Sequence, residues 1–325
     1  MAATVPEAGA HRRADIQGLR AIAVLLVVAF HAGLPVPGGF VGVDVFFVIS
    51  GFVITGLLLR EFAGSGRLNF RRFYSRRFRR LIPALALVVT VTALLAIPLQ
   101  SPFGAQQVTA KTGIGSMLLL ANAVIYQVSG AYFDGPAELN ALLNTWSLSV
   151  EEQFYLLFPA VLAVGWWLSR RWFSRVGHRE LGAITLVALL SGASFALSVW
   201  FTFADHPIGF IERPAQFAFY ASLTRAWEFG AGALLAFAAQ RWQPSQRAGL
   251  ILGSAGAVLL ILSVFLIDGA VPFPGWAALP PVAATLLLIA AGPTSATGRA
   301  LSVGVMVWIG ALSYSWYLWH WPLIV

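Results

Sequence analysis

Residues 40–59 read FVGVDVFFVISGFVITGLLL, a run of twenty residues in which the one charged side chain is Asp44. A helix of about 20 residues is roughly 30 Å long, which is the thickness of the hydrocarbon core of a bilayer. The segment that follows, 60–80, contains eight Arg and one acid, Glu61. Because basic residues concentrate in cytoplasmic loops, this stretch predicts a membrane helix that ends at the cytoplasmic face.

The composition of the whole chain supports a membrane protein. Of the 325 residues, 58% are hydrophobic and 10% are charged, and the mean hydropathy is +0.78. A soluble domain has roughly a quarter charged residues. The formal net charge is +8, but no polar domain is present to offer a basic face, so nucleic-acid binding is not expected. The absence of cysteine excludes disulfides, thiol nucleophiles and Cys-ligated metals.

Apolar runs separated by charged segments predict an all-α fold, a polytopic transmembrane helix bundle of about nine to ten spans. We expect nine of these spans at 18–34, 40–59, 81–99, 149–168, 181–203, 218–240, 248–267, 276–291 and 303–325.

The stretch 113–128 is a tenth apolar segment, and the question is whether it crosses the membrane. Span 81–99 leaves the cytoplasm and span 149–168 has to return to it, so the stretch between them should not cross completely. Its uninterrupted apolar core, 117–121, is short and is followed by Asn122. We expect a re-entrant or interfacial segment on the outer side. The alternative is a tenth span that breaks the charge rule once.

The other loops agree with a cytoplasmic N-terminus. Loops expected at the outer side, such as 34–39 and 268–275, are poor in basic residues. Residues 1–14 are predicted to be a cytoplasmic tail and 15–325 a transmembrane domain. The last apolar run reaches Val325 with no polar flank, so we expect this domain to be incomplete at its C-terminus. The cytoplasmic loops are marked by Arg170, Arg171, Arg175, Arg179, Arg241, Arg247 and Arg299.

Ionisable residues inside spans are costly in a bilayer and are therefore the first candidates for function. Arg20 and His31 lie eleven residues apart on the first span. At 100° per residue this is about 1100°, so both side chains face the same way, roughly 16 Å apart along the axis. His31 suits the work of a general base, since an imidazole exchanges protons near neutral pH. No metal is predicted, because no second His follows three or four residues later.

Two further groups of buried charge each have a structural and a functional explanation. Asp44 follows a glycine-rich entry, 38–42, and either caps the helix or takes part in the site. Arg225 and Glu228 are three residues apart on one helix face, which favours mutual neutralisation over a functional role.

The segment 70–80 interleaves Arg with aromatic residues. Guanidinium groups bind phosphates in a bidentate manner and, like aromatic rings, stack on a flat base. This pattern suits a ligand such as coenzyme A. An interfacial helix on anionic lipid headgroups explains it equally well.

Two clusters complete the candidates. The start of span 149–168 carries Trp146, Glu151, Glu152 and Tyr155, and Glu151 and Tyr155 share one helix face. A single acid near a helix N-terminus is also explained by the helix dipole. The end of the chain carries His320 among aromatic residues typical of a membrane interface.

Five motifs, in this order along the chain, resemble those of the acyltransferase 3 family of bacterial membrane acyltransferases. They cover nearly the whole chain, from Asp15 to Val325. The motifs are 15–21 followed by His31, 40–52, 76–83, 146–155 and 314–322. The ending 318–322 resembles members fused to an extracytoplasmic SGNH hydrolase-like domain, which is a possible partner domain in a longer chain.

The resemblance implies a role for each candidate. His31 resembles the catalytic base, and we expect Glu151 and Asp44 to assist it. Arg20 with Arg77 and Arg80, or with Arg76 and Arg79, resembles the group that binds acyl-CoA. The residues expected to line the substrate site are Asp15, Trp146, Tyr155, Arg225, Glu228 and His320.

The function that the resemblance implies is O-acyl transfer. The donor would be cytoplasmic acyl-CoA, usually acetyl-CoA, as a substrate rather than a permanently bound cofactor. The acceptor would be a hydroxyl of an extracytoplasmic glycan or glycolipid, and the location a bacterial plasma membrane. The transfer is either direct or passes through an acyl-enzyme. The alternatives are a transporter or flippase that uses the same buried charges, and a non-catalytic scaffold.

Overall fold

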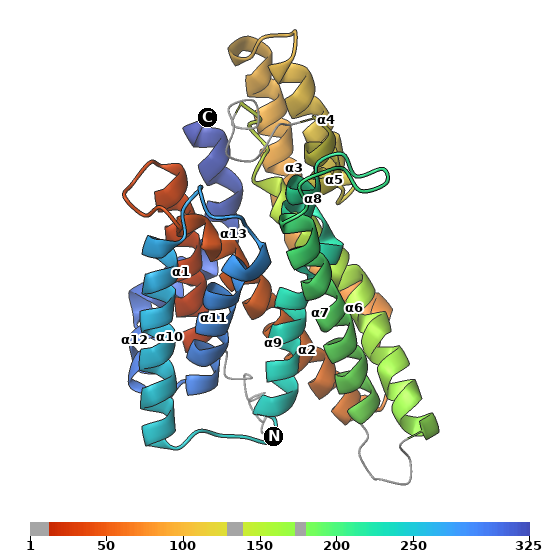
Figure 1. The fold of residues 1–325 in the computed structure, drawn as a ribbon, viewed down its shortest axis with the longest axis vertical. Coiled ribbons are helices and arrows are strands. Elements are labelled where there is room, and N and C mark those ends of the chain that lie inside the picture. The colour runs from red at the N-terminus through yellow and green to blue at the C-terminus, as the bar shows by residue number, and fades with distance from the viewer. Residues whose placement is uncertain (1–12, 129–138, 173–179) are drawn as a thin grey trace, which may run out of the picture.

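The computed structural model describes residues 13–128, 139–172 and 180–325, and these form helices joined by loops (Figure 1). Six helices are long and apolar enough to cross a membrane. They are α1 (Ala14–His31), α2 (Gly42–Ser65, preceded by the short helix η1, Gly39–Val41), α3 (Phe70–Leu99), α6 (Thr145–Trp172), α7 (Leu181–Thr202) and α10 (Gln246–Leu266).

Three further helices lie where the sequence predicts the remaining spans. They are α9 (Ser222–Ala239), α11 (Leu279–Ala291, preceded by η4, Gly275–Ala278) and α13 (Gly304–Ile324). The fold class, an all-α polytopic membrane bundle, is confirmed. Whether α9, α11 and α13 each cross the bilayer stays a prediction. The short helices α8 (Pro214–Tyr220) and α12 (Ala296–Leu301) connect longer ones.

The stretch 113–128 is divided between two helices, α4 (Ala105–Met117) and α5 (Ala121–Val128). At 1.5 Å per residue these are about 20 and 12 Å long, so neither reaches across a bilayer alone. The break falls at Leu119, which has a positive φ of 61°. Ser149 accepts the backbone N–H of Ala121 at 3.1 Å, and Gln153 donates to the Leu119 carbonyl at 2.7 Å. The break is therefore held by α6, and its geometry supports a segment that does not cross.

The two ends of the bundle differ in charge. The start of α1, the end of α6 with the start of α7, and the connection between α9 and α10 lie towards one end of Figure 1. The loop after α1, the connection from α10 to η4 and the C-terminus lie towards the other end. Arg170 and Arg171 at the end of α6 and Arg241 and Arg247 beside the α9–α10 connection therefore share one end, as an inward-positive orientation requires.

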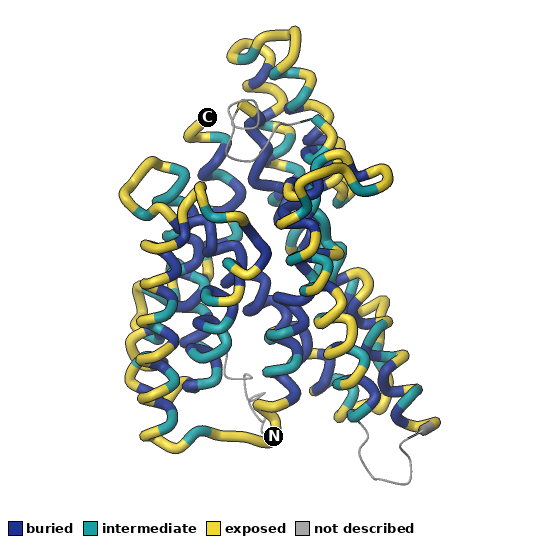
Figure 2. Tube along the Cα trace, viewed as in Figure 1, coloured by how far each residue is buried: buried dark blue, intermediate teal, exposed yellow. Residues whose placement is uncertain are grey.

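Close backbone contacts set the distances between the central helices. A Cβ on Gly51 of α2 would lie 1.9 Å from the carbonyl oxygen of Phe229 on α9, and a Cβ on Gly232 would lie 2.1 Å from that of Val48. On α13, a Cβ on Gly310 would lie 1.8 Å from the carbonyl oxygen of Gln17 on α1. The side chains that face each other across these pairs are therefore close. Figure 2 shows the buried residues along these inner surfaces and the exposed ones on the outer helices.

The contact at Gly51 gives a test of this packing. Gly51→Ala should destabilise the protein by about 1–3 kcal/mol, because the added methyl group overlaps backbone that cannot move freely. The measurement is the thermal unfolding midpoint in detergent. Gly64→Ala on the same helix is the matched control, since no atom lies within 4 Å of its added Cβ. Equal midpoints for the two variants would contradict the packing of α2 on α9.

Candidate active site

Two histidines far apart in the sequence meet where α1 ends and in the last turns of α13. Nδ1 of His31 lies 2.8 Å from Nε2 of His320. The two rings are nearly parallel, at 11°, with centroids 5.1 Å apart. Nδ1 of His320 lies 2.8 Å from the carbonyl oxygen of Tyr317, and the Trp321 ring meets His31 edge-on at 4.6 Å between centroids. We call this pair the histidine dyad.

The contacts of the dyad determine where its protons lie. A carbonyl oxygen can only accept, so Nδ1 of His320 carries the hydrogen. In a neutral ring the other nitrogen, Nε2, is then an acceptor. With both rings neutral, the proton between them would belong to Nδ1 of His31, and the lone pair of His31 would be on Nε2. A base oriented by a second group in this way is a recurring arrangement in enzymes.

Hydrogen bonds fix Tyr317, whose carbonyl holds His320. Its hydroxyl lies 2.5 Å from Oγ of Ser147 and donates to the carbonyl of Asn144 at 3.2 Å. The Asn144 side chain donates back to the Tyr317 carbonyl at 2.5 Å. The start of α6 and the end of α13 are thus joined by a closed polar network beside the dyad.

Arg20 lies nearer the start of α1 than His31, on the same face of the helix. Its Nε and Nη2 donate to Oγ of Ser313 on α13 at 3.2 and 3.1 Å. A cavity of about 40 Å³ lies beside it, and its polar lining includes Ser147, Glu151 and Tyr317. A cavity of this size holds a few water molecules. Arg20 and the neighbourhood of the dyad therefore share one polar space along α1 and α13.

Glu151 and Glu152 form the next part of the site. Oε1 of Glu151 accepts hydrogen bonds from Ser50 at 2.6 Å and from Tyr155 at 2.9 Å. Nε of Arg77 donates to Glu152 at 2.8 Å, and its Nη2 also contacts the same carboxylate. Nη2 of Arg77 lies 3.8 Å from Glu151. The Arg77 guanidinium stacks on the Tyr155 ring at 3.3 Å. Arg77 is thus paired with carboxylates of the protein itself.

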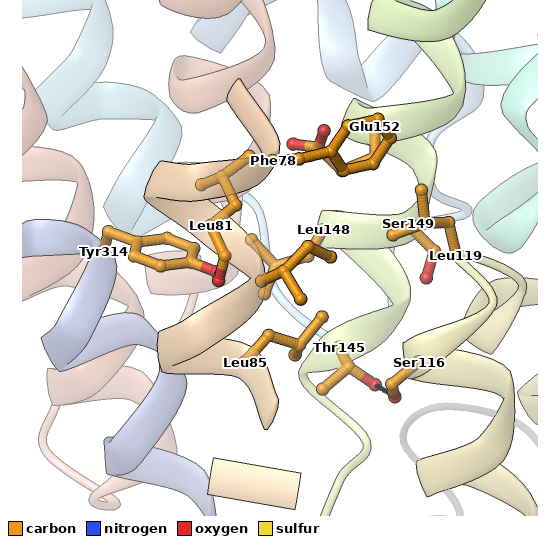
Figure 3. Close-up of a pocket in the computed structure, with 11 residues that line it drawn as sticks. Phe78, Leu81, Leu85, Ser116, Leu119, Thr145, Leu148, Ser149, Glu152 and Tyr314 are labelled. Atoms are coloured by element: carbon orange, nitrogen blue, oxygen red, sulfur yellow. Dashed lines mark hydrogen bonds between the residues drawn. The ribbon is translucent and has the colours of Figure 1, made fainter. Parts of the chain in front are cut away.

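A second cavity, of about 20 Å³, lies between α3, α6, α13 and the α4–α5 break (Figure 3). Glu152 lies at one edge, and the middle is formed by leucines, including Leu81 and Leu148. Tyr314 donates to the Leu81 carbonyl at 3.0 Å and closes one side. Both cavities are too small for an acyl-pantetheine arm, so entry of such a group requires side chains to move.

The remaining candidate cations for a phosphate ligand, Arg76, Arg79 and Arg80, are exposed on α3. They are placed to meet either a soluble anion or lipid headgroups.

Asp44, Arg225 and Glu228 form a separate buried group, which we call the buried triad. Nη2 of Arg225 donates to Asp44 at 2.9 Å, and its Nε lies 3.1 Å from Glu228. All three are at most 1% exposed. Four rings surround the guanidinium, with centroids 5.4 to 5.9 Å from its carbon, and these belong to Phe47, Trp146, Phe219 and Phe273.

The buried triad does not border the cavities beside Glu151 and Glu152 in the part of the chain that the structure describes. The predicted pairing of Arg225 with Glu228 is present. Asp44 joins it rather than the dyad, and Trp146 packs over the triad. Asp15 lies near the Arg-rich end, where it accepts from Arg13 at 2.6 Å, and Arg13 also donates to the Ile289 carbonyl. The expected roles of Asp15, Asp44, Arg225 and Glu228 in substrate handling stay predictions.

Sequence patterns did not reveal several contacts of the site. The dyad joins residues separated by 289 positions, so no local spacing indicates it. No local spacing indicates that Ser313 is the partner of Arg20 either, because the two are 293 positions apart. The spacing of Tyr317 and His320 places them on one helix face, but the same pattern is typical of an aromatic belt at a membrane interface.

Comparison with known proteins places the chain in a family. The family model described as an acyltransferase domain matches residues 13–325. The chain belongs to this family, acyltransferase 3. It is therefore a multi-pass membrane protein of an acyltransferase family, as the five motifs indicate.

Three bacterial relatives illustrate the match. The chain is 32% identical to the putative peptidoglycan O-acetyltransferase YrhL of Bacillus subtilis over 95% of its length and 48% of that protein. It is 31% identical to the peptidoglycan O-acetyltransferase OatA of Listeria monocytogenes, over 95% and 49%. For the O-acetyltransferase OatA of Staphylococcus aureus the values are 30%, 95% and 50%. The chain spans about half the length of these relatives. No solved structure matches it.

The buried triad gives the test of the electrostatics. Arg225→Met should lower stability by about 3–5 kcal/mol, because two carboxylates are then buried without a cation. Adding Asp44→Asn and Glu228→Gln should recover much of the loss, since neutral amides replace the charges. The measurement is the thermal midpoint and the folded yield after membrane extraction. A triple variant no better than Arg225→Met would contradict the charge argument.

Proposed function

We propose that this chain is a membrane O-acyltransferase that moves an acyl group, usually acetyl, from cytoplasmic acyl-CoA to a hydroxyl of a cell-wall glycan on the outer side. The observation that carries the proposal is the histidine dyad at the Arg-poor end of the bundle, on the same helix face as Arg20. Membership of the family and the functions of the relatives, peptidoglycan O-acetyltransferases, support the reaction type and the acceptor class.

The proposed chemistry uses the lone pair on Nε2 of His31. This nitrogen takes the proton of an acceptor hydroxyl while the oxygen attacks the carbonyl carbon of the thioester. The tetrahedral intermediate then collapses, the carbon–sulfur bond breaks, and the thiolate leaves. The thiolate takes the proton back from His31, so the products are the O-acyl ester and CoA with a free thiol.

His320 serves this reaction as a positioning residue. Its hydrogen bond to the Tyr317 carbonyl determines that it accepts from His31, which orients the His31 ring and places its lone pair on Nε2. The imidazolium that forms on His31 keeps this bond, because Nδ1 still donates. His320 thereby stabilises the charged state of the base without exchanging the transferred proton.

On the donor side, the exposed Arg76, Arg79 and Arg80 would hold the phosphates of acyl-CoA. The acyl-pantetheine arm would pass Glu152 and Arg20 towards the dyad. Arg77 is paired with Glu152. It would therefore stand at the entrance of this path and exchange partners when the donor binds.

The first test addresses the dyad. In membranes that carry the full-length protein, His31→Ala should abolish acyl transfer and CoA release. His320→Ala should lower kcat at least tenfold, in the range for loss of base orientation, with little change in KM. His320→Gln should recover part of the rate, because its amide oxygen can accept from Nδ1 of His31.

His206→Ala, at an exposed position, is the matched control and should behave like the wild type. Full activity of His31→Ala would overturn the role of His31 as the base, whereas wild-type CoA release no greater than that of empty membranes would favour a transporter. Identical loss of kcat in His320→Ala and His320→Gln would argue that His320 acts otherwise than as an acceptor.

The second test addresses the donor. Arg79→Ala/Arg80→Ala should raise the KM for acetyl-CoA about tenfold or more, because charge-assisted contacts to phosphate are lost. Arg71→Ala/Arg72→Ala removes the same charge from exposed positions earlier in the same segment, and should change KM little. If neither pair raises KM, the segment interacts with lipid headgroups rather than with the donor. Equal rises would overturn the assignment to Arg79 and Arg80 in favour of the charge of the whole segment.

A further inference from the structure

The largest cavity described lies away from the histidine dyad and the donor residues. It has a volume of about 600 Å³ and lies between α5, α6, α8 and the start of α9, with part of the connection 203–213 as one wall. Ligand sites in proteins typically measure about 300–1,000 Å³. The cavities beside Arg20 and Glu152 have about 40 and 20 Å³. This pocket is thus large enough for a sugar unit without rearrangement.

The position of the pocket places it on the acceptor side. The connection 203–213 and the loop after α1 link helices at the same, Arg-poor end of the bundle (Figure 1). The wall residue Tyr220 packs on Trp146 with ring centroids 5.4 Å apart. The next residue along, Ser147, bonds Tyr317, whose carbonyl holds His320. The pocket and the dyad therefore lie on either side of the first turn of α6.

The lining suits a neutral, hydroxyl-rich ligand better than it suits the donor. One carboxylate, Glu212, and one guanidinium, Arg213, give the wall no net charge, so it offers nothing to the several phosphates of CoA. The exposed amide of Gln127 provides donors and an acceptor, which match sugar hydroxyls. Tyr126 and Phe217, packed edge-to-face at 5.8 Å, offer ring faces to the C–H face of a sugar.

The polar side chains that line the pocket are held by hydrogen bonds within the protein. Gln153 donates to Asn122 at 2.9 Å and accepts from Ser222, and Asn122 donates to the Tyr220 carbonyl at 3.0 Å. Arg213 donates to the Tyr126 carbonyl and lies 5.1 Å from the centroid of its ring. These bonds join α5, α6, α8 and α9. A pocket fixed in this way loses little conformational freedom when a ligand binds.

We infer that this pocket is a saccharide subsite, which holds one sugar unit of the acceptor glycan while a neighbouring unit presents its hydroxyl to His31. The inference rests on the proposed function for the identity of the ligand, and it adds the place where the acceptor binds. The exposed side chains of Gln127 and Glu212 at the rim are the ones that a bound sugar would contact first.

The test separates binding from chemistry. The probe is the soluble β-1,4-linked tetramer of N-acetylglucosamine, titrated into the full-length protein in lipid nanodiscs. Gln127→Ala/Glu212→Ala should weaken its binding and raise its KM in acetyl transfer about tenfold, the loss expected for two hydrogen bonds. The kcat at saturating tetramer and the KM for acetyl-CoA should be unchanged.

Gln107→Ala/Glu180→Ala is the matched control. It removes one amide and one carboxylate outside the pocket and should leave tetramer binding unchanged. Equal binding by the pocket variant and the wild type, or no binding by the wild type, overturns the subsite while CoA release remains. Weaker binding with no CoA release from any variant sustains the subsite and overturns the proposed function instead.

Discussion

Arg225 carries a positive charge at the centre of a bundle that has no bulk water to solvate it. Its two carboxylate partners come from α2 and from its own helix, and the rings around it come from α2, α6, α8 and the loop before η4. Each of these elements has to stay in place for the charge to remain neutralised and covered. The start of α6 is fixed by the same arrangement, because Trp146 belongs to it. Ser147, on the next position, then reaches Tyr317 and so determines where the dyad lies.

The fold could be predicted from the sequence because hydropathy and Arg distribution respond to the bilayer directly. The common face of Arg20 and His31 followed from helix geometry alone, and both residues do line or approach the polar space between α1 and α13. The partner of each could not be predicted in this way. His320 and Ser313 are brought to them by packing of α13 on α1, which depends on Gly310 and on contacts that no local pattern encodes.

Arg77 illustrates a different limit. Its place in an Arg-aromatic run correctly indicated a concentration of positive charge, but six similar arginines gave no means to distinguish the one that turns inward. The structure selects it because Glu151, Glu152 and Tyr155 form one face of α6 opposite that turn of α3. The 600 Å³ pocket was also hidden, since its lining comes from five separate segments, each unremarkable on its own. Composition indicates whether a surface faces lipid or water, whereas the position of a pocket depends on how distant segments pack together.

Because Arg77 is paired with Glu152, any anion that binds Arg77 has to compete with a carboxylate of the protein itself. A single phosphate that approaches Arg77 has to displace a carboxylate held by two contacts on a stacked guanidinium, and gains little by doing so. A ligand with several phosphates can first bind the exposed arginines nearby and then make the exchange within one encounter. On the proposed donor path, the resident carboxylate would therefore select anions by the number of phosphates they carry rather than by the strength of a single charge.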